Sequence, residues 1–180
     1  KNINGIGYRK DGVPVLTTPE LGVPNDRMDI DLPGYAWDLL PYNKKPFDLY
    51  RCPMWHAEYD SNKRTPYASI STSLGCQFRC EFCMINILNR DDDDPIGVAG
   101  NYNKMRYWST DFVLKQFDKL VDMGVENIRI IDEMFLLNPK YYKPFCEGLI
   151  ERGYGEKLRM WAYSRVDTIR RPDLLNLVRE

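Results

Sequence analysis

Three cysteines lie within eight consecutive residues, Cys76, Cys80 and Cys83 in the stretch CQFRCEFC. Thiolates are soft ligands that suit iron–sulfur clusters, zinc and copper(I). A structural zinc site is normally closed by four ligands, and a cubane iron–sulfur cluster normally takes four cysteines. A compact set of three thiols therefore predicts a metal centre with one open position, at which another molecule can bind and react.

Two other interpretations of the cysteines remain open, a zinc-stabilised binding module and a chance grouping. Cys52, Cys146 or His56 could supply a distant fourth ligand, but none of them has a supporting neighbour. We interpret Cys52 and Cys146 as ordinary buried thiols. His56, the sole histidine, is interpreted as a packed side chain or one that supports the site.

Two more groups of polar residues follow β-prone stretches of the sequence. Asp132 and Glu133 come after VENIRII, and Ser164 and Arg165 lie at the end of LRMWAYS. In parallel α/β folds, functional residues collect at the carboxyl ends of the strands. An acid and a base at this edge could bind the ammonium and carboxylate of an amino acid. Alternatively, Arg165 forms a structural ion pair with Asp132, Glu133 or Asp167.

The elements that must position these residues alternate between strand and helix from residue 66 onward. Ser109 and Asn138 are good helix N-caps, and Pro144 is expected to kink its helix or delay its start. This alternation predicts three parallel βα units with right-handed crossovers. The expected strands are 66–74, 125–131 and 158–164, and the expected helices are 109–124, 138–153 and 171–180.

The preceding part of the chain has a different character. GIGYRKDGVPVL predicts a β-hairpin with Asp11 and Gly12 in its turn, and frequent prolines then indicate a connector between domains. Its anchors on a neighbouring domain are expected to be Tyr35, Trp37, Leu39 and Leu40. We therefore divide the chain into 1–65 and 66–180. The first residue is not methionine and the last lies in a helix-like pattern, so we expect a fragment of a longer protein.

Composition excludes several functional classes. The formal net charge of −1, with basic residues scattered along the chain, argues against a nucleic-acid partner. The apolar runs are too short to span a membrane and no signal peptide is visible. Five cysteines without a secretion signal favour metal or redox chemistry in a reducing compartment, which predicts a cytoplasmic protein.

The stretch CQFRCEFC resembles the signature of the radical SAM enzymes. The resemblance implies a [4Fe–4S] cluster held by the three cysteines, with the amino and carboxylate groups of S-adenosylmethionine on the fourth iron. It implies that Phe82 lies near the adenine, although Phe82 and Phe78 could equally cover the cluster. A flavodoxin- or ferredoxin-type protein would supply electrons. The implied contacts to S-adenosylmethionine are Asp132, Glu133, Ser164 and Arg165.

A narrower resemblance is to the radical SAM subfamily that carries a cobalamin-binding domain. It rests on the hairpin and connector, on YRCPMWHAEY, PYASISTSLGC, DEMF and YSRVD. It implies that residues 66–180 are the first three βα units of a partial (β/α)6 TIM-like barrel, with cobalamin bound by a domain outside the chain. The Gly-Gly-Glu motif of many radical SAM enzymes is replaced by Asp132, Glu133 and Met134.

The resemblance implies reductive cleavage of S-adenosylmethionine to a 5′-deoxyadenosyl radical, followed by C-methylation or oxidative cyclisation of an unknown small molecule. The fragment alone is expected to be inactive. An alternative within the family is an enzyme without cobalamin, such as a methylthiotransferase acting on RNA. That alternative would call for a basic surface and a second cysteine set, and the sequence has neither.

Overall fold

The computed structural model describes residues 3–18, 22–40, 67–78, 80, 82–84 and 104–180. Its centre is a parallel sheet with the strand order β3 (Tyr67–Ile70), β6 (Asn127–Ile130) and β7 (Arg159–Trp161). Both strand pairs are parallel, and Ile70 of β3 lies opposite Ile130 of β6. The predicted parallel α/β arrangement is confirmed.

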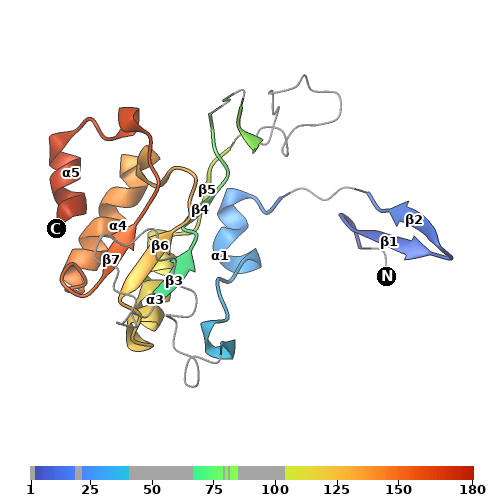
Figure 1. The fold of residues 1–180 in the computed structure, drawn as a ribbon, viewed down its shortest axis with the longest axis horizontal. Helices are drawn as coiled ribbons and strands as arrows, with labels where there is room; N and C mark the ends of the chain where they lie inside the picture. The colour runs from blue at the N-terminus through green and yellow to red at the C-terminus, as the bar shows by residue number, and fades with distance from the viewer. Residues whose placement is uncertain (1–2, 19–21, 41–66, 79, 81, 85–103) are drawn as a thin grey trace, which may run out of the picture.

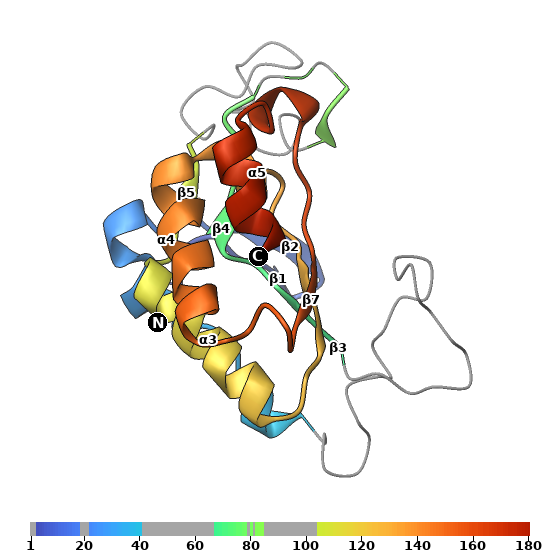
Figure 2. The same ribbon diagram turned by 90° about the vertical axis from the view of Figure 1, so that its left-hand side faces the viewer.

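Three helices lie on one side of this sheet, as Figures 1 and 2 show. They are α3 (Thr110–Asp122), α4 (Pro139–Glu151) and α5 (Pro172–Arg179). Ile70 and Ile128 belong to the same buried core cluster as Phe117 of α3 and Phe145 of α4. The core therefore sits between the sheet and the helices, and the carboxyl ends of the strands are left at one edge.

Both predicted helix caps are present. The Ser109 hydroxyl accepts a hydrogen bond from the Phe112 amide at 3.1 Å, and the Asn138 side chain accepts one from the Lys140 amide at 3.1 Å. Of the two effects expected of Pro144, a kink or a delayed start, the delayed start is wrong, because α4 begins at Pro139 and contains Pro144. Pro144 has no N–H to donate to the carbonyl four residues earlier. Because Pro144 is on the exposed side of the helix, water can hydrogen-bond to that carbonyl instead.

The first predicted strand is shorter than expected. It ends at Ile70, and Ser73–Leu74 forms a separate strand, β4, that pairs antiparallel with β5 (Arg106–Tyr107). The break lies at Thr72, whose amide donates to the Asp132 carboxylate at 2.6 Å instead of continuing the ladder. A side chain from the neighbouring strand end thus terminates β3.

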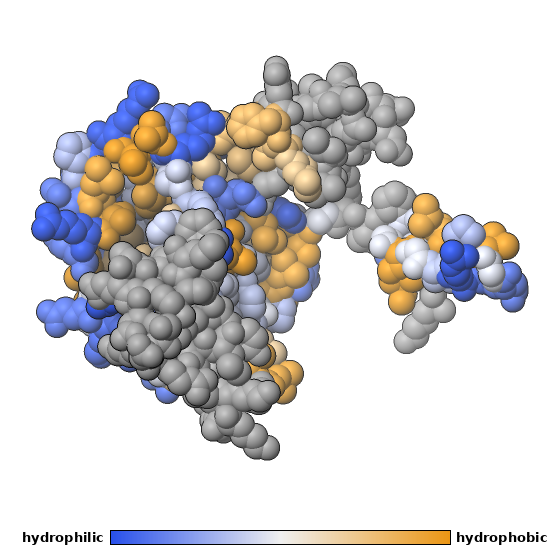
Figure 3. Space-filling model, in the orientation of Figure 1, coloured by the Kyte–Doolittle hydropathy of each residue, from blue (hydrophilic) through white to orange (hydrophobic). Residues whose placement is uncertain are grey.

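The predicted hairpin is confirmed and lies apart from the sheet (Figure 1). Strands β1 (Gly7–Lys10) and β2 (Val13–Leu16) pair antiparallel. Asp11 and Gly12 in the turn have φ of 51° and 80°, the left-handed values that a two-residue hairpin turn requires. Apolar side chains are exposed on the hairpin (Figure 3), among them Val13 and Leu16.

Residues 22–40 pack against the sheet and α3. Trp37, in a short 3-10 helix (Trp37–Leu39), is buried, and Tyr35 and Leu40 pack on the core as predicted. The prediction for Leu39 is wrong, since its side chain is 79% exposed. Trp37 and Leu40 are three residues apart and share one face of the turn, which leaves Leu39 on another face. Met28 of the short helix α1 (Met28–Asp31) is an additional anchor, only 1% exposed.

The predicted domain boundary at residue 65 lies outside the described residues, as do Cys52 and His56. In the part of the chain that the structure describes, no helix combines the length and the apolar character needed to cross a membrane.

Candidate functional site

The three clustered cysteines lie on the loop that follows β4, next to the carboxyl ends of the parallel strands. None of the three is in a disulfide, and all three are partly exposed. The Cys83 amide donates to the Cys80 carbonyl at 3.0 Å, which closes a tight turn between the last two. Burial raises the pKa of Cys76; a backbone hydrogen bond at Phe78 opposes this, and nearby Cys83, Cys80 and Glu133 reinforce it.

This donor set fits an iron–sulfur cluster in number and chemistry, because three cysteine thiols share one short loop. Among the residues with described positions, no three Cys, His, Asp or Glu side chains already converge closely enough to hold a metal ion.

Arg165 connects the third strand end to the cysteine loop. Its guanidinium carbon lies 4.2 Å from the centre of the Phe78 ring, and Nη1 lies 3.8 Å from Cys80 Sγ. Its Nε and Nη2 each donate to the Asp167 carboxylate at 3.0 Å. The ion pair that the sequence left as an alternative is thus present, together with contact to the predicted cluster loop.

Asp132 points toward the base of the cysteine loop. It is only 2% exposed, and its carboxylate accepts hydrogen bonds from the Thr72 amide, the Thr72 hydroxyl and the Ser73 hydroxyl, at 2.6, 2.6 and 2.7 Å. Burial raises the pKa of Asp132, while the bonds from Thr72 and Ser73 lower it. The next residue, Glu133, is exposed and is the acid of this pair that faces solvent.

The remaining predicted contacts are exposed. The Phe82 side chain is 92% exposed, and the Ser164 hydroxyl shares a hydrogen bond with the Thr168 hydroxyl at 2.6 Å. Of the predicted residues, Arg165 therefore contacts the cysteine loop, and Asp132 is hydrogen-bonded to the segment that leads into it.

Sequence reasoning missed two tyrosines at this edge of the sheet. The Tyr141 hydroxyl donates to the Thr72 carbonyl at 2.9 Å, and its ring lies 4.5 Å, centre to centre, from that of Tyr107. Burial raises the pKa of Tyr141, which keeps its phenol protonated as a donor. No sequence pattern indicated this contact, because Thr72 and Tyr141 are 69 positions apart.

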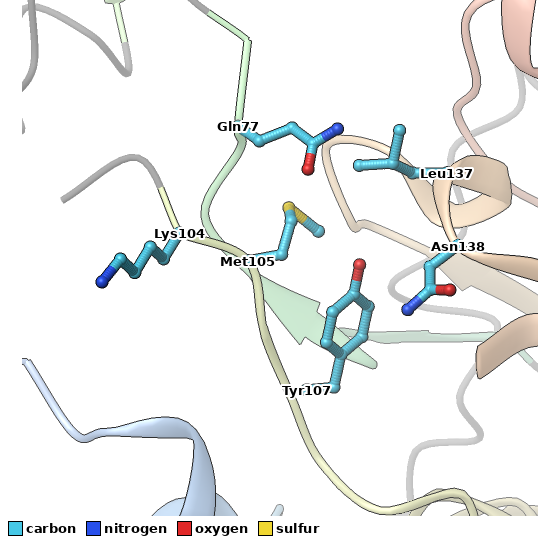
Figure 4. Close-up of a pocket in the computed structure, with 6 residues that line it drawn as sticks. All are labelled: Gln77, Lys104, Met105, Tyr107, Leu137 and Asn138. Carbon is cyan, nitrogen blue, oxygen red and sulfur yellow. The ribbon is translucent and has the colours of Figure 1, made fainter. Parts of the chain in front are cut away.

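A cavity of about 500 Å³ adjoins the cysteine loop (Figure 4). Gln77, which directly follows Cys76, extends toward the same space as the Tyr107 hydroxyl. The lining residues are Gln77, Lys104, Met105, Tyr107, Leu137 and Asn138.

Gly75 sets the direction in which the chain enters the cysteine loop. Its φ is +89°, and an added Cβ would lie 2.7 Å from the Lys104 carbonyl oxygen. We expect Gly75→Ala to lower the free energy of unfolding more than Gly124→Ala does. Gly124 has a similar φ of +82° but nothing within 4 Å, so its substitution costs only the left-handed strain of about 1 kcal/mol.

Denaturant unfolding of both variants would measure this difference. Equal losses at the two glycines would show that the close approach to Lys104 does not constrain the loop.

Comparison with known proteins places the chain beside methyltransferases. No family model matches. The chain is 24% identical over 115 residues to the hopanoid C-2 methylase of Rhodopseudomonas palustris, a match covering 62% of this chain and 20% of that protein. It is 26% identical over 169 residues to an uncharacterized methyltransferase of Pyrococcus horikoshii, covering 93% of this chain and 30% of that protein. The chain thus spans less than a third of these relatives.

Two solved structures share the fold. One is OxsB, a cobalamin-dependent S-adenosylmethionine radical enzyme with aqua-cobalamin bound, with a TM-score of 0.56 and 22% identity over 96% of this chain and 20% of that one. The other is TsrM of Kitasatospora setae, a radical S-adenosylmethionine methyltransferase with cobalamin and a [4Fe–4S] cluster bound. It has a TM-score of 0.50 and 18% identity over 91% of this chain and 29% of that one. The chain therefore has a mixed α/β fold like that of these enzymes, which confirms its resemblance to the cobalamin-dependent radical SAM enzymes.

Proposed function

We propose that this chain is the part of a cobalamin-dependent radical SAM enzyme that holds the [4Fe–4S] cluster and S-adenosylmethionine. The observation that carries the proposal is the position of three cysteine thiols on one loop, beside the carboxyl ends of parallel strands. Arg165, which reaches that loop from the third strand end, supports it. Residues 66–180 would be the first three units of a partial (β/α)6 barrel, and residues 1–65 the connection to a preceding domain.

Each candidate residue has a task in this proposal. Cys76, Cys80 and Cys83 hold the cluster, which when bound supplies the electron that cleaves S-adenosylmethionine to a 5′-deoxyadenosyl radical. Arg165 can donate to the carboxylate of that amino acid, and Glu133 can accept from its ammonium group. The Phe82 side chain is exposed and can cover the adenine of S-adenosylmethionine.

The reaction of the whole enzyme is proposed from its relatives. Three of their names favour methyl transfer, and the name of the hopanoid C-2 methylase favours a carbon acceptor in a small molecule. Oxidative cyclisation is the second outcome. Cobalamin would be bound outside this chain, electrons would come from a flavodoxin- or ferredoxin-type protein, and the enzyme would work in the cytoplasm. The two alternative functions are a radical SAM enzyme that does not use cobalamin and a zinc-stabilised binding module.

Anaerobic reconstitution of the full-length parent protein with iron and sulfide tests the proposal. We expect about four irons and four sulfides at this site, and a change in the electron paramagnetic resonance spectrum of the reduced cluster when S-adenosylmethionine is added. Binding of one zinc ion, without an iron–sulfur chromophore, would instead support the zinc module and refute the proposal.

Arg165→Ala should weaken S-adenosylmethionine binding by about tenfold or more, because one charge-assisted hydrogen bond to a carboxylate is lost. The measurement is titration of the cluster-loaded full-length protein. Arg171→Ala is a matched control, because Arg171 also forms an ion pair with the aspartate two residues later, Asp173, and is likewise exposed.

Arg171→Ala should leave the affinity unchanged. If Arg165→Ala does the same while the cluster stays intact, Arg165 is only the partner of Asp167.

A further inference from the structure

We infer that Asp132 is a positioning residue, which anchors the start of the cysteine loop to the end of β6 and does not itself bind S-adenosylmethionine. The inference rests on the proposed function of that loop. A buried carboxylate must be satisfied by hydrogen bonds, and the Asp132 carboxylate accepts three of them from Thr72 and Ser73. Ser73 is three residues before Cys76.

Thr72 is held from two directions. Its amide and hydroxyl both donate to Asp132, and its carbonyl accepts from the Tyr141 hydroxyl of α4 at 2.9 Å and from the Trp108 amide at 3.4 Å. Its side chain is fully buried. Because every polar group of Thr72 has a partner on another element, this residue is a fixed point from which the loop departs.

The hydrogen bond between Thr72 and Asp132 lies directly beyond the last backbone bond between β3 and β6. The Ile131 amide still donates to the Ile70 carbonyl at 2.9 Å, as in the parallel ladder. One residue further along, the Asp132 side chain takes the place of a backbone acceptor for Thr72. The end of β6 and the start of the cysteine loop are therefore held together by hydrogen bonds. Since a metal site needs its ligands drawn together, a fixed starting point reduces the entropy lost when the three thiols converge.

The hydrogen bonds distinguish a positioning role from a charge role. In Asp132→Asn, Oδ1 can still accept from the Thr72 amide, and Nδ2 can donate to the two hydroxyls, which can rotate to accept. Asparagine thus keeps the contact and removes the charge. In Asp132→Leu the shape is similar, but the Thr72 amide is left without an acceptor.

The experiment uses the full-length parent protein reconstituted with its cluster. Loss of iron to a chelator should be about tenfold or more faster for Asp132→Leu than for the wild type, the size typical when a supporting partner of a metal ligand is removed. For Asp132→Asn we expect a rate within about twofold of the wild type and unchanged S-adenosylmethionine affinity, because the geometry is kept.

If Asp132→Leu does not fold, Thr72→Val and Ser73→Ala test the positioning role instead, since each removes a single hydroxyl donor. Both should lose iron several-fold faster than the wild type, and wild-type rates in both would overturn the inference. Wild-type iron retention in a folded Asp132→Leu would overturn it as well. Loss of S-adenosylmethionine affinity in Asp132→Asn with iron retained would make Asp132 a direct contact. A wild-type protein that binds no cluster would refute the proposed function instead.

Discussion

Cys80→Ala is expected to abolish cluster binding completely. The proposed cluster has three protein ligands, so two remaining thiolates leave two of its irons without a protein ligand. Iron and sulfide content should fall from about four of each to none, and the visible absorption of the cluster should disappear. Cys76→Ala and Cys83→Ala should behave in the same way, because all three thiols lie on one loop.

Cys146→Ala is the matched control. Cys146 is also a free cysteine, but it is 6% exposed within α4, and burial raises its pKa to about 11. The Cys146→Ala variant should retain the full iron content of the wild-type protein. A cluster that survives Cys80→Ala, or one lost in Cys146→Ala without loss of folding, would contradict the assigned ligands.

Phe145→Ala is expected to destabilise the fold by about 3–5 kcal/mol, the usual cost of removing a fully buried aromatic ring. Phe145 of α4 is 0% exposed and packs edge-on against Phe117 of α3, with ring centres 5.1 Å apart, and against Phe135 at 5.6 Å. The contact with Phe117 joins two of the three helices that cover the sheet. Equilibrium unfolding in denaturant would measure the loss.

Phe82→Ala serves as the control for stability, since it removes the same ring from a side chain that is 92% exposed. Its free energy of unfolding should change by less than about 0.5 kcal/mol. Similar losses for Phe82→Ala and Phe145→Ala would mean that the core does not lie between α3, α4 and the sheet.

Local patterns in the sequence were sufficient for the helix caps, the hairpin turn and the order of strands and helices, although the first strand is shorter than predicted. Ser109 and Asn138 cap their helices through atoms only two or three residues away, and Asp11 with Gly12 forms the hairpin turn that any such pair favours. The alternation of strands and helices leads to parallel pairing because crossover connections permit little else. The spacing of the three cysteines, likewise, is a property of the chain before it folds.

Tertiary structure decided which residue of an adjacent pair is buried and which is exposed. Asp132 and Glu133 are adjacent acidic residues that the sequence does not distinguish, but Asp132 is buried against Thr72 and Glu133 is exposed. Leu39 and Leu40 divide in the same way between solvent and core.

The contacts that shape the site join residues far apart in the chain. Asp132 is 60 positions from Thr72, and Arg165 is 85 positions from Cys80. Sequence spacing specifies which residues share a helix face or a turn, because these depend on the local repeat of the backbone. Which carboxylate turns inward, and which guanidinium meets a thiol, depends on how the sheet and helices pack, and so appears only when the chain is folded.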